Sequence, residues 1–393
     1  MTDDAVFKKE VEQWLKANYP QKLGHLPSEQ RIWGGRKEPF VNQLARQWFG
    51  AMRDKGWLAP GWPVEYGGGG LSAGQVKILQ QAMQKHGCQP PMMSLGIHMM
   101  GPTIMEFGTE EQKQRFLPPI ARGEVRWCQG YSEPGAGSDL ASLKCKAELQ
   151  GDYYIVTGQK IWTSFADKSD YLFCLVRTDF KAPKHQGISV LLIDMESEGV
   201  STRPINLISG SSHFCEVFLD HVKVPKENLL GELDKGWSIA KRMLQHERNM
   251  MGQGDMGEPF DPVLSEWACD YIGRENGKLA DPVLRDAITA NAIRLQAVQS
   301  TTRRVMAEMK AGDNGAASSV LKAAASEAVQ EKFELLLQVA GNRAMAWDAG
   351  EVFDENEVRA AHEWAFSKVQ TIGGGTTEIQ YNIIAKHILG LPD

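Results

Sequence analysis

The chain has 393 residues, 42% of them hydrophobic and 23% charged, which allows a large buried core and two or three domains. Its formal net charge of -6 offers no basic surface, so nucleic acid and anionic membranes are not expected partners. Its six cysteines are scattered, which fits neither a disulfide framework nor a zinc site, and a reducing cytoplasm is the expected location.

The first residues show no targeting pattern. Asp3, Asp4 and Glu10 are acidic, and no apolar run of the kind found in secretory signals accompanies them. The chain also lacks an uninterrupted apolar stretch of about 18 residues, the minimum for a membrane span. We therefore expect neither secretion nor membrane insertion.

Residues 1–123 are predicted to form a helical domain. Their apolar residues recur at helical spacing, as in Phe7, Val11 and Leu15. The segment 59–70 interrupts this pattern, because its prolines and glycines cannot continue a helix and favour a loop.

Residues 124–232 are predicted to form a small β domain. The period changes to short β-type runs, which are Tyr153–Val156, Tyr171–Arg177, Ile188–Ile193 and Val217–Val224. Turn residues separate these runs, namely Gly151–Asp152, Gly158 and Gly187. The intervals are too short for crossover helices, so the sheet is expected to be mostly antiparallel.

Residues 233–393 return to the helical period and predict a helical bundle. The expected helices are Ile239–Met250, Pro282–Lys310, Ala316–Val339, Glu357–Thr371 and Glu378–Leu389, with a turn at 312–315. The predicted fold class is therefore α+β and mainly α, in three domains.

One glycine-rich segment suggests ligand binding. In Gly130-Tyr-Ser-Glu-Pro-Gly-Ala-Gly-Ser-Asp139, two glycines around an alanine let the backbone approach a ligand closely. Ser132 and Ser138 offer hydroxyls to a phosphate, ribose or thioester group. An ordinary polar turn explains the composition equally well, but the whole run closely resembles the first motif of the acyl-CoA dehydrogenase family.

Other segments extend the resemblance over almost the whole chain. They are Gly108–Gln112 with Phe116–Pro118, Lys160–Ser164, Gly187–Ile188, Asp234–Trp237 and Thr376–Gln380. The resemblance implies a helical domain, a β domain and a C-terminal four-helix bundle, with FAD as cofactor. No Gly-x-Gly-x-x-Gly fingerprint of a Rossmann fold follows a predicted strand.

The resemblance also implies the residues that contact the ligands. Trp162 would cover one side of the isoalloxazine, and Ser164 would meet its N5 edge, although a lone tryptophan is more often a core residue. The implied cofactor residues are Gln129, Tyr131, Ser132, Gly137, Ser138, Trp162, Thr163, Ser164, Arg274, Gln338, Gly341, Thr376 and Glu378. The implied substrate residues are Ser138, Arg248 and Gly374.

Two elements depart from the family pattern. The usual Arg-x-x-Phe-Gly, which reaches a neighbouring subunit's flavin, is reduced here to the stretch 271–277 around Arg274. The usual Gln-x-x-Gly-Gly becomes Gln338-Val-Ala-Gly-Asn342. An exposed arginine and a helix-ending glycine would explain Arg274 and Gly341 equally well.

The family's commonest catalytic base is missing. A glutamate usually precedes the Gly-Thr of the C-terminal loop, and Gly374 occupies that position here. Other family members carry the glutamate on the first long helix of the bundle, where Glu247 is the candidate in this chain. A surface glutamate beside Arg248 is the plain alternative. His246 is a rival that points about 100° away on a helix, and Glu363 and Asp354 have no motif support.

The expected function is α,β-dehydrogenation of an acyl-CoA, with reoxidation by an electron-transferring flavoprotein. A homotetramer or homodimer is expected, and a heterotetramer is possible in this family. One alternative is an acyl-CoA oxidase or flavin oxygenase on the same fold, and another is a half-site subunit paired with a sister chain. The resemblance is to bacterial enzymes for bulky, branched, dicarboxylic or steroid side-chain thioesters, and Gly373–Gly375 predict a broad pocket.

Overall fold

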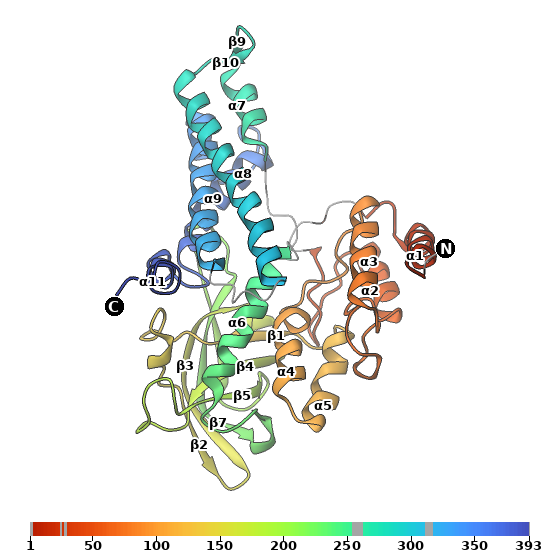
Figure 1. Ribbon diagram of the computed structural model, residues 1–393, viewed down its shortest axis with the longest axis vertical. Helices are drawn as coiled ribbons and strands as arrows, with labels where there is room; N and C mark the ends of the chain where they lie inside the picture. The colour runs from red at the N-terminus through yellow and green to blue at the C-terminus, as the bar shows by residue number, and fades with distance from the viewer. Residues whose placement is uncertain (1–2, 24–25, 27–29, 254–261, 311–316, 393) are drawn as a thin grey trace. The chain divides into compact units, whose positions relative to one another are not determined.

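The computed structural model describes residues 3–23, 26, 30–253, 262–310 and 317–392 (Figure 1). The chain divides into two compact units. The first unit comprises Met1–Ile205 and His213–Gly257, and the second comprises Asn206–Ser212 and Glu258–Asp393. None of the helices in the described ranges combines the length and apolar character needed to cross a membrane.

The first unit begins with helices, as predicted for this part of the chain. They are α1 (Asp3–Asn18), α2 (Gln43–Asp54), α3 (Ala73–Lys85), α4 (Gly101–Phe107) and α5 (Glu110–Ala121), and α6 (Gly236–Gln253) joins the same unit from later in the sequence. Side-chain capping fixes the first residue of two of these helices, α3 and α5. Thr109 and Gln112 form a reciprocal capping box at α5, and Ser72 and Gln75 do the same at α3.

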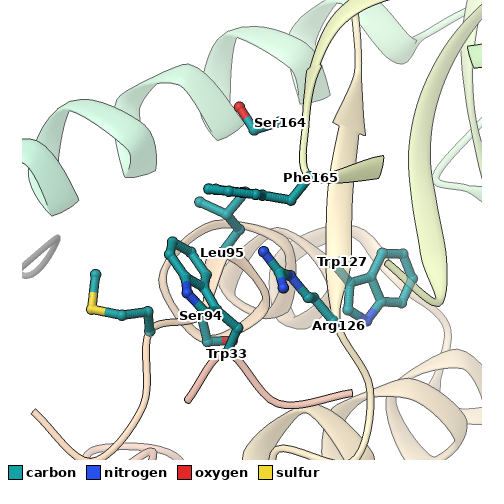
Figure 2. Close-up of a pocket in the computed structure, with 8 residues that line it drawn as sticks. Trp33, Ser94, Leu95, Arg126, Trp127, Ser164 and Phe165 are labelled. Atoms are coloured by element: carbon teal, nitrogen blue, oxygen red, sulfur yellow. The ribbon is translucent and has the colours of Figure 1, made fainter. Parts of the chain in front are cut away.

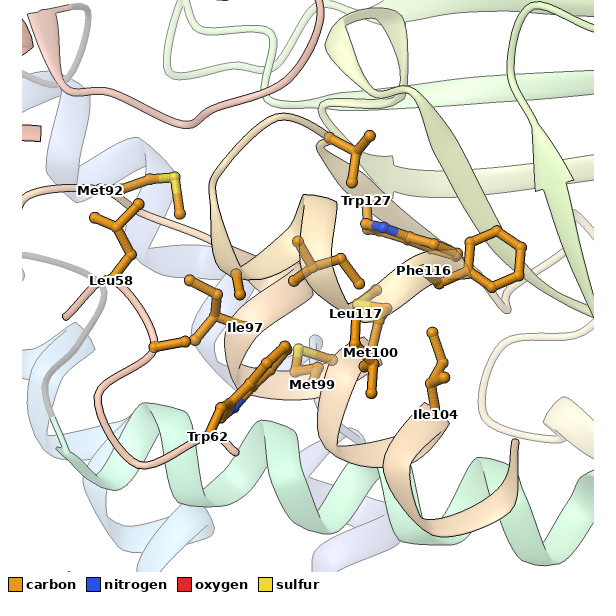
Figure 3. Close-up of a cluster of buried hydrophobic side chains, with 14 of the residues drawn as sticks. Leu58, Trp62, Met92, Ile97, Met99, Met100, Ile104, Phe116, Leu117 and Trp127 are labelled. Carbon is orange, nitrogen blue, oxygen red and sulfur yellow. The ribbon is translucent and has the colours of Figure 1, made fainter. Parts of the chain in front are cut away.

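Large apolar side chains form the core beneath these helices (Figure 3). Trp62, Met100 and Ile104 are buried together with Phe116 and Leu117 of α5. The predicted loop 59–70 contributes Trp62 to this core and contains a single 3-10 turn, Val64–Tyr66. The loop is therefore a packed part of the helical region.

A sheet of eight strands occupies the middle of the first unit. Its strands are β1 (Trp127–Gly130), β2 (Lys146–Gln150), β3 (Tyr153–Ser164), β4 (Tyr171–Arg177), β5 (Ile188–Asp194), β6 (Val200–Ile205), β7 (Phe214–Pro225) and β8 (Leu229–Leu230). Their order is β6-β7-β3-β2-β4-β5-β8, and β1 also pairs with β4. Most pairs are antiparallel as predicted, but β1 and β2 each run parallel to β4. The chain reverses direction between β2 and β3 and again between β3 and β4, so β4 runs in the same direction as β2.

The prediction that Gly158 separates two strands is wrong. Gly158 lies inside β3, which runs without interruption from Tyr153 to Ser164. A Cβ atom there would lie 2.7 Å from the Cα of Cys145, so only glycine allows this close approach of two backbones. The continuous strand carries the predicted flavin segment Lys160–Ser164 into the sheet.

The second unit is helical, as predicted. It contains α7 (Leu264–Ile272), α8 (Pro282–Lys310), α9 (Ser318–Ala340), α10 (Glu355–Ser367) and α11 (Thr377–His387), with the small strands β9 (Arg274–Glu275) and β10 (Lys278–Leu279). Helix α9 contacts each of the other four helices. The expected turn at 312–315 lies outside the described residues. Helix α10 ends at Ser367, four residues before the predicted end, and a 3-10 turn follows at Lys368–Thr371.

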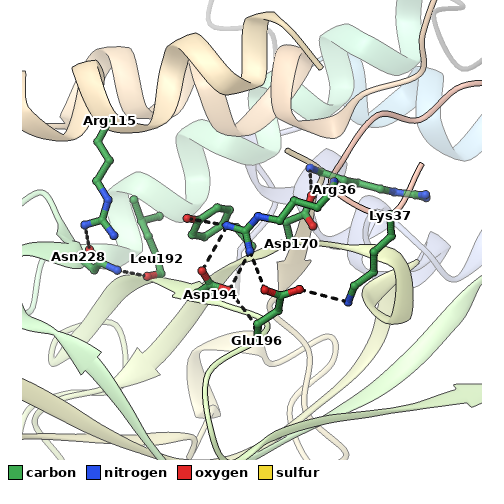
Figure 4. Close-up of polar contacts among 10 residues, drawn as sticks. Arg36, Lys37, Arg115, Asp170, Leu192, Asp194, Glu196 and Asn228 are labelled. Atoms are coloured by element: carbon green, nitrogen blue, oxygen red, sulfur yellow. Dashed lines mark hydrogen bonds and ion pairs between the residues drawn. The ribbon is translucent and has the colours of Figure 1, made fainter. Parts of the chain in front are cut away.

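A polar cluster joins the segment before α2 to strands β4 and β5 (Figure 4). The backbone N–H of Arg36 donates to the Oδ2 of buried Asp170 at 3.1 Å. The Arg36 guanidinium contacts Asp194 at 3.4 Å and Glu196 at 3.2 Å. These contacts hold the chain near Trp33 against the sheet.

Candidate functional site

The structure brings the two motifs of the β domain together. The backbone N–H of Ile161, on β3, donates to the carbonyl oxygen of Ser132 at 2.9 Å. The Nζ of Lys160 donates to the carbonyl oxygen of Tyr131 at 3.2 Å and to Oε1 of Glu133 at 2.7 Å. Residues almost 30 positions apart in sequence are thus joined by backbone and side-chain hydrogen bonds.

A buried ion pair supports the start of the glycine-rich segment. The Lys160 side chain is fully buried and that of Glu133 nearly so. Glu133 also accepts hydrogen bonds from the backbone N–H groups of Lys144, at 2.6 Å, and Cys145, at 2.8 Å. A buried pair with its remaining lone pairs satisfied fixes both partners, because breaking it would leave an uncompensated charge. The segment therefore has a rigid base.

The tip of the same segment is open. Glu133 and Ala136 exchange two backbone hydrogen bonds, at 3.1 and 3.0 Å, which close a tight turn. Gly137 and Ser138 are exposed beyond it, and a Cβ atom on Gly137 would meet nothing within 4 Å. This part of the loop has room for a ligand against its backbone.

Trp162 is held in an unusual backbone conformation. The β3–β7 register shifts between Lys160 and Thr163, and Trp162 takes a φ of +60°. A positive φ is costly for a bulky residue, and such strain gathers at functional sites. Trp162 is 53% exposed, and the centre of its ring lies 6.2 Å from that of Phe214. A large aromatic face is thus available for stacking.

Two buried polar atoms on the neighbouring strands β1 and β3 lack hydrogen-bond partners among the described residues. They are Nε2 of Gln129 on β1 and Oγ1 of Thr163 on β3, and Thr163 is completely buried. A buried donor or acceptor without a hydrogen bond costs about 1–3 kcal/mol, so such atoms call for a ligand or water. Together with the exposed indole, they fit a planar cofactor that carries hydrogen-bonding groups on its edge, as FAD does.

Glu247 lies on the face of α6 that packs against the sheet domain. Ala240 and Met243 are buried on the same face, since they precede Glu247 by seven and four positions. Tyr131 donates its hydroxyl to the carbonyl oxygen of Ala240 at 3.4 Å. Burial, and after it the charge of Glu247, hold the pKa of Tyr131 well above its ordinary value. The half-buried Glu247 carboxylate is therefore near the glycine-rich segment. The Arg248 side chain lies outside the described part of the chain.

His246 points elsewhere. Its Nε2 lies 3.2 Å from Oε1 of Glu106, and Arg242 contacts the same carboxylate through Nε at 2.6 Å. Burial lowers the pKa of His246, and the neighbouring Glu106 opposes that shift. The histidine is engaged in a cluster with α4, whereas Glu247 is near Tyr131.

The glycine loop of the second unit presents only backbone. Gly374 is exposed with a φ of +68°, and a Cβ atom there would meet nothing within 4 Å. Gln380 donates from Nε2 to the carbonyl oxygens of Gly374 and Gly375, at 3.2 and 3.4 Å. Thr376 caps α11 through its hydroxyl, and exposed Glu378 lies in the first turn, where hydrogen bonds from its own backbone and from Thr376 lower its pKa.

The remaining candidates of the second unit lie in separate places. Arg274 is exposed on β9 and donates from Nε to the sulfur of Cys269 at 3.2 Å. Gln338 is exposed near the end of α9, and Gly341 ends that helix with a φ of +56°. Asp354 caps α10, and burial raises the pKa of Glu363. The cofactor roles of Arg274, Gln338 and Gly341 stay predictions.

A pocket in the first unit contains residues that sequence reasoning did not single out (Figure 2). Its lining comprises Trp33, Met93, Ser94, Leu95, Arg126, Trp127, Ser164 and Phe165. Only Ser164 among them was predicted. The others come from four separate parts of the sequence, and none carries a motif that would have indicated a site.

Three family descriptions match the chain along its length. They are "Acyl-CoA dehydrogenase, N-terminal domain" over residues 25–124, "middle domain" over 128–222 and "C-terminal domain" over 234–389. These matches fall on the helical region, the sheet and the C-terminal helices in turn.

Similar proteins are found in sequence and in structure. The acyl-CoA dehydrogenase IpdE1 of Mycolicibacterium smegmatis is 33% identical over 396 residues, covering 98% of this chain and 97% of that protein. The solved Tcur3481-Tcur3483 steroid ACAD has a TM-score of 0.77 and 28% identity, covering 100% of this chain and 98% of that chain. The ChsE4-ChsE5 complex from Mycobacterium tuberculosis has a TM-score of 0.73 and 30% identity, covering 100% and 98%. The chain belongs to the acyl-CoA dehydrogenase family.

Proposed function

We propose that the chain binds FAD and introduces an α,β double bond into an acyl-CoA, with Glu247 removing the α proton. The observation that carries the proposal is the assembly around Tyr131 and Lys160. Hydrogen bonds join the two predicted ligand segments there, and the charge of Glu247 acts on Tyr131 in the same place. A ligand-binding surface and a carboxylate are thus provided by one compact unit.

The flavin contacts are assigned to β1, β3 and the segment between β1 and β2. Trp162 offers its exposed indole to the isoalloxazine, and Gln129 and Thr163 offer the unpartnered polar atoms. Ser164, Ser132 and the Gly137–Ser138 backbone complete this part of the proposed site. When bound, FAD supplies the hydride acceptor at N5. Arg274, Gln338, Gly341, Thr376 and Glu378 stay candidates for further contacts, including contacts to a neighbouring subunit.

The chain's own residues would perform the proton transfer. Glu247 accepts the α proton, a task for which a carboxylate must reach the substrate carbon within hydrogen-bonding range. Ser138 contacts the CoA chain in this proposal. Gly374, in the second unit, stays a candidate for the substrate contact that the family resemblance implies.

We also propose that the chain works together with a sister subunit. Two similar structures are named as pairs, Tcur3481-Tcur3483 and ChsE4-ChsE5. They support the proposal that this chain acts with a sister subunit, in place of a homotetramer or homodimer. Similarity to a protein named as a steroid ACAD also supports a bulky, ring-bearing acyl group. An electron-transferring flavoprotein is the proposed acceptor for reoxidation.

The function is tested by purifying the chain alone and with candidate sister chains. We expect bound flavin, and we expect a panel of acyl-CoAs to bleach it without oxygen while forming the enoyl-CoA in equal amount. Rapid hydrogen peroxide formation in air would favour the oxidase. Flavin and activity that appear only with a sister chain would favour the half-site subunit. Failure of every preparation to bind FAD would contradict the proposal.

A further inference from the structure

Arg126 lies buried between two aromatic rings. Its guanidinium carbon is 4.6 Å from the ring centre of Trp33 and 4.7 Å from that of Phe165. Figure 2 shows the guanidinium end between these rings, with Ser164 beyond Phe165. Stacking on two rings compensates part of the cost of burying the charge, because each ring face attracts a cation.

The charge of Arg126 is only partly compensated. The residue is 9% exposed, and its Nη2 has no hydrogen-bond partner among the described residues. Burial lowers the pKa of Arg126 to about 10, so the guanidinium still carries its charge at neutral pH. The nearby Asp170 accepts from the backbone N–H of Arg126 at 2.7 Å. A buried cation with a free donor is expensive unless something accepts its hydrogen bond.

The surroundings of Arg126 form the pocket described above. Two hydroxyl-bearing residues, Ser94 and Ser164, line it together with the apolar side chains of Met93, Leu95 and Trp127. The side chains fill the space closely, so an incoming group has to displace one of them. Met93 is the best suited to move, because an unbranched thioether adapts its shape at low cost.

We propose that Arg126 binds an acceptor oxygen, a carboxylate or a carbonyl, on the part of the acyl group that lies beyond the β carbon. The inference rests on the proposed function. Ser164 lines the pocket and is also the residue assigned to the N5 edge, where the β carbon would lie. Ser164 and Arg126 line the same pocket with the ring of Phe165 between them, so acyl atoms beyond that carbon would reach Arg126 by passing the edge of that ring.

The chemistry of the pocket favours an oxygen-bearing acyl group over a plain hydrocarbon chain. A methyl or methylene group beside Nη2 would leave the donor unpaired and add its desolvation cost. A carboxylate or a ring carbonyl accepts the hydrogen bond, and the rings of Trp33 and Phe165 provide apolar contact for the adjoining carbons. Sites built this way discriminate strongly against analogues that lack the oxygen.

The test compares three thioesters with six-carbon acyl groups: adipoyl-CoA, 5-oxohexanoyl-CoA and hexanoyl-CoA. We expect the wild-type enzyme to prefer the first or the second over hexanoyl-CoA in kcat/KM. Arg126→Met should lower that preference about 10- to 100-fold while hexanoyl-CoA changes little. The substrate that loses most identifies the oxygen as carboxylate or carbonyl. Arg126→Lys keeps the charge but not the planar guanidinium. Its preference for the oxygen-bearing thioesters should lie between those of the wild-type enzyme and Arg126→Met.

A binding measurement keeps the test independent of turnover. The enoyl-CoA products of the oxygen-bearing thioesters should raise the melting temperature of the wild-type protein more than 2-hexenoyl-CoA does, and Arg126→Met should remove the difference. Equal preference for all three thioesters in the wild-type enzyme, or equal losses in Arg126→Met, would overturn this inference. Either result would leave the proposed function standing. If none of the three reduces the flavin while the binding difference persists, the pocket assignment stands and the six-carbon acyl groups are rejected as substrates. Failure of the whole acyl-CoA panel, ring-bearing thioesters included, would contradict the proposed function and leave the pocket assignment standing.

Discussion

Two glycine-rich loops of this chain differ in how they are supported. The loop 130–139 is anchored by the buried Lys160–Glu133 pair and by the backbone hydrogen bond from Ile161 of β3 to Ser132. The loop 373–375 follows a 3-10 turn, is held by Gln380 through carbonyl oxygens, and is open around Gly374. The first loop is anchored by side chains, while the second offers little besides its backbone.

This difference bears on where the chemistry resides. A loop without side chains can donate N–H groups to a carbonyl oxygen but cannot take a proton from carbon. Our proposal therefore takes the base from another element, α6, where the charge of Glu247 acts on Tyr131 at the start of the well-supported loop. In our proposal, the loop that supports the ligand and the residue that acts as base therefore both belong to the first unit.

The largest effect is expected from breaking the support of the first loop. Lys160→Met leaves the Glu133 carboxylate buried without its partner and should lower the free energy of unfolding by about 3–5 kcal/mol. Lys184→Met is the matched control, because Lys184 forms an exposed ion pair with Asp139 of the same loop, and an exposed pair contributes little to stability. Urea unfolding measures both. Equal effects of the two variants would show that the buried pair does not anchor the loop.

The second largest effect is expected from removing the exposed indole of Trp162. Trp162→Ala should weaken FAD binding about 10- to 100-fold and alter the flavin spectrum, because a large stacking surface is removed. Trp162→Phe keeps a ring and should retain most of the affinity. Flavin content after dialysis and the absorption spectrum report the result. Full occupancy with an unchanged spectrum in Trp162→Ala would reject the placement.

Alanine at two glycines compares the close contact in the sheet with the open loop. In Gly158→Ala the new Cβ atom meets the Cys145 backbone at 2.7 Å, and we expect a loss of about 1–3 kcal/mol of stability. In Gly374→Ala nothing lies within 4 Å, so only the positive φ opposes the substitution, at about 1 kcal/mol. Thermal unfolding compares the stability of the two variants. A larger loss for Gly374→Ala would mean that the loop is packed.

The smallest effect is expected at the open tip of the first loop. Ser138→Ala removes one neutral hydrogen bond to the CoA chain in our proposal and should raise KM about 2- to 10-fold. FAD retention should not change. Titration of acyl-CoA against both proteins checks this, and unchanged affinity counts against the substrate role of Ser138.

The sequence predicted much of the fold because long periodic elements carry a strong signal. Pro282–Lys310 and Tyr171–Arg177 were predicted with the bounds that the structure shows. Short or exposed strands were missed, since β2 is mostly exposed and β1 has only four residues. Gly158 was misread because the need for a close backbone contact is invisible until the strand partner is known.

The site was predicted less completely. The family motifs indicated Trp162, Ser164 and Glu247, and these assignments still await experiment. No local sequence pattern indicated a role for Arg126, because the two rings that enclose it come from the distant positions 33 and 165. The pairing of Lys160 with Glu133 depends likewise on a contact across 27 positions. Such long-range pairs follow from the fold and are not encoded in any local pattern.

The central claim, that Glu247 is the base, is tested most directly by following flavin reduction in Glu247→Gln. The substitution keeps size and hydrogen bonding but removes the proton acceptor. We predict that acyl-CoA still binds and perturbs the flavin spectrum, while bleaching slows about 10²- to 10⁴-fold. Partial recovery in the double variant Glu247→Gln, Gly374→Glu would add support, because the loop is the family's other position for the base. Reduction of the Glu247→Gln flavin at the wild-type rate would contradict the account.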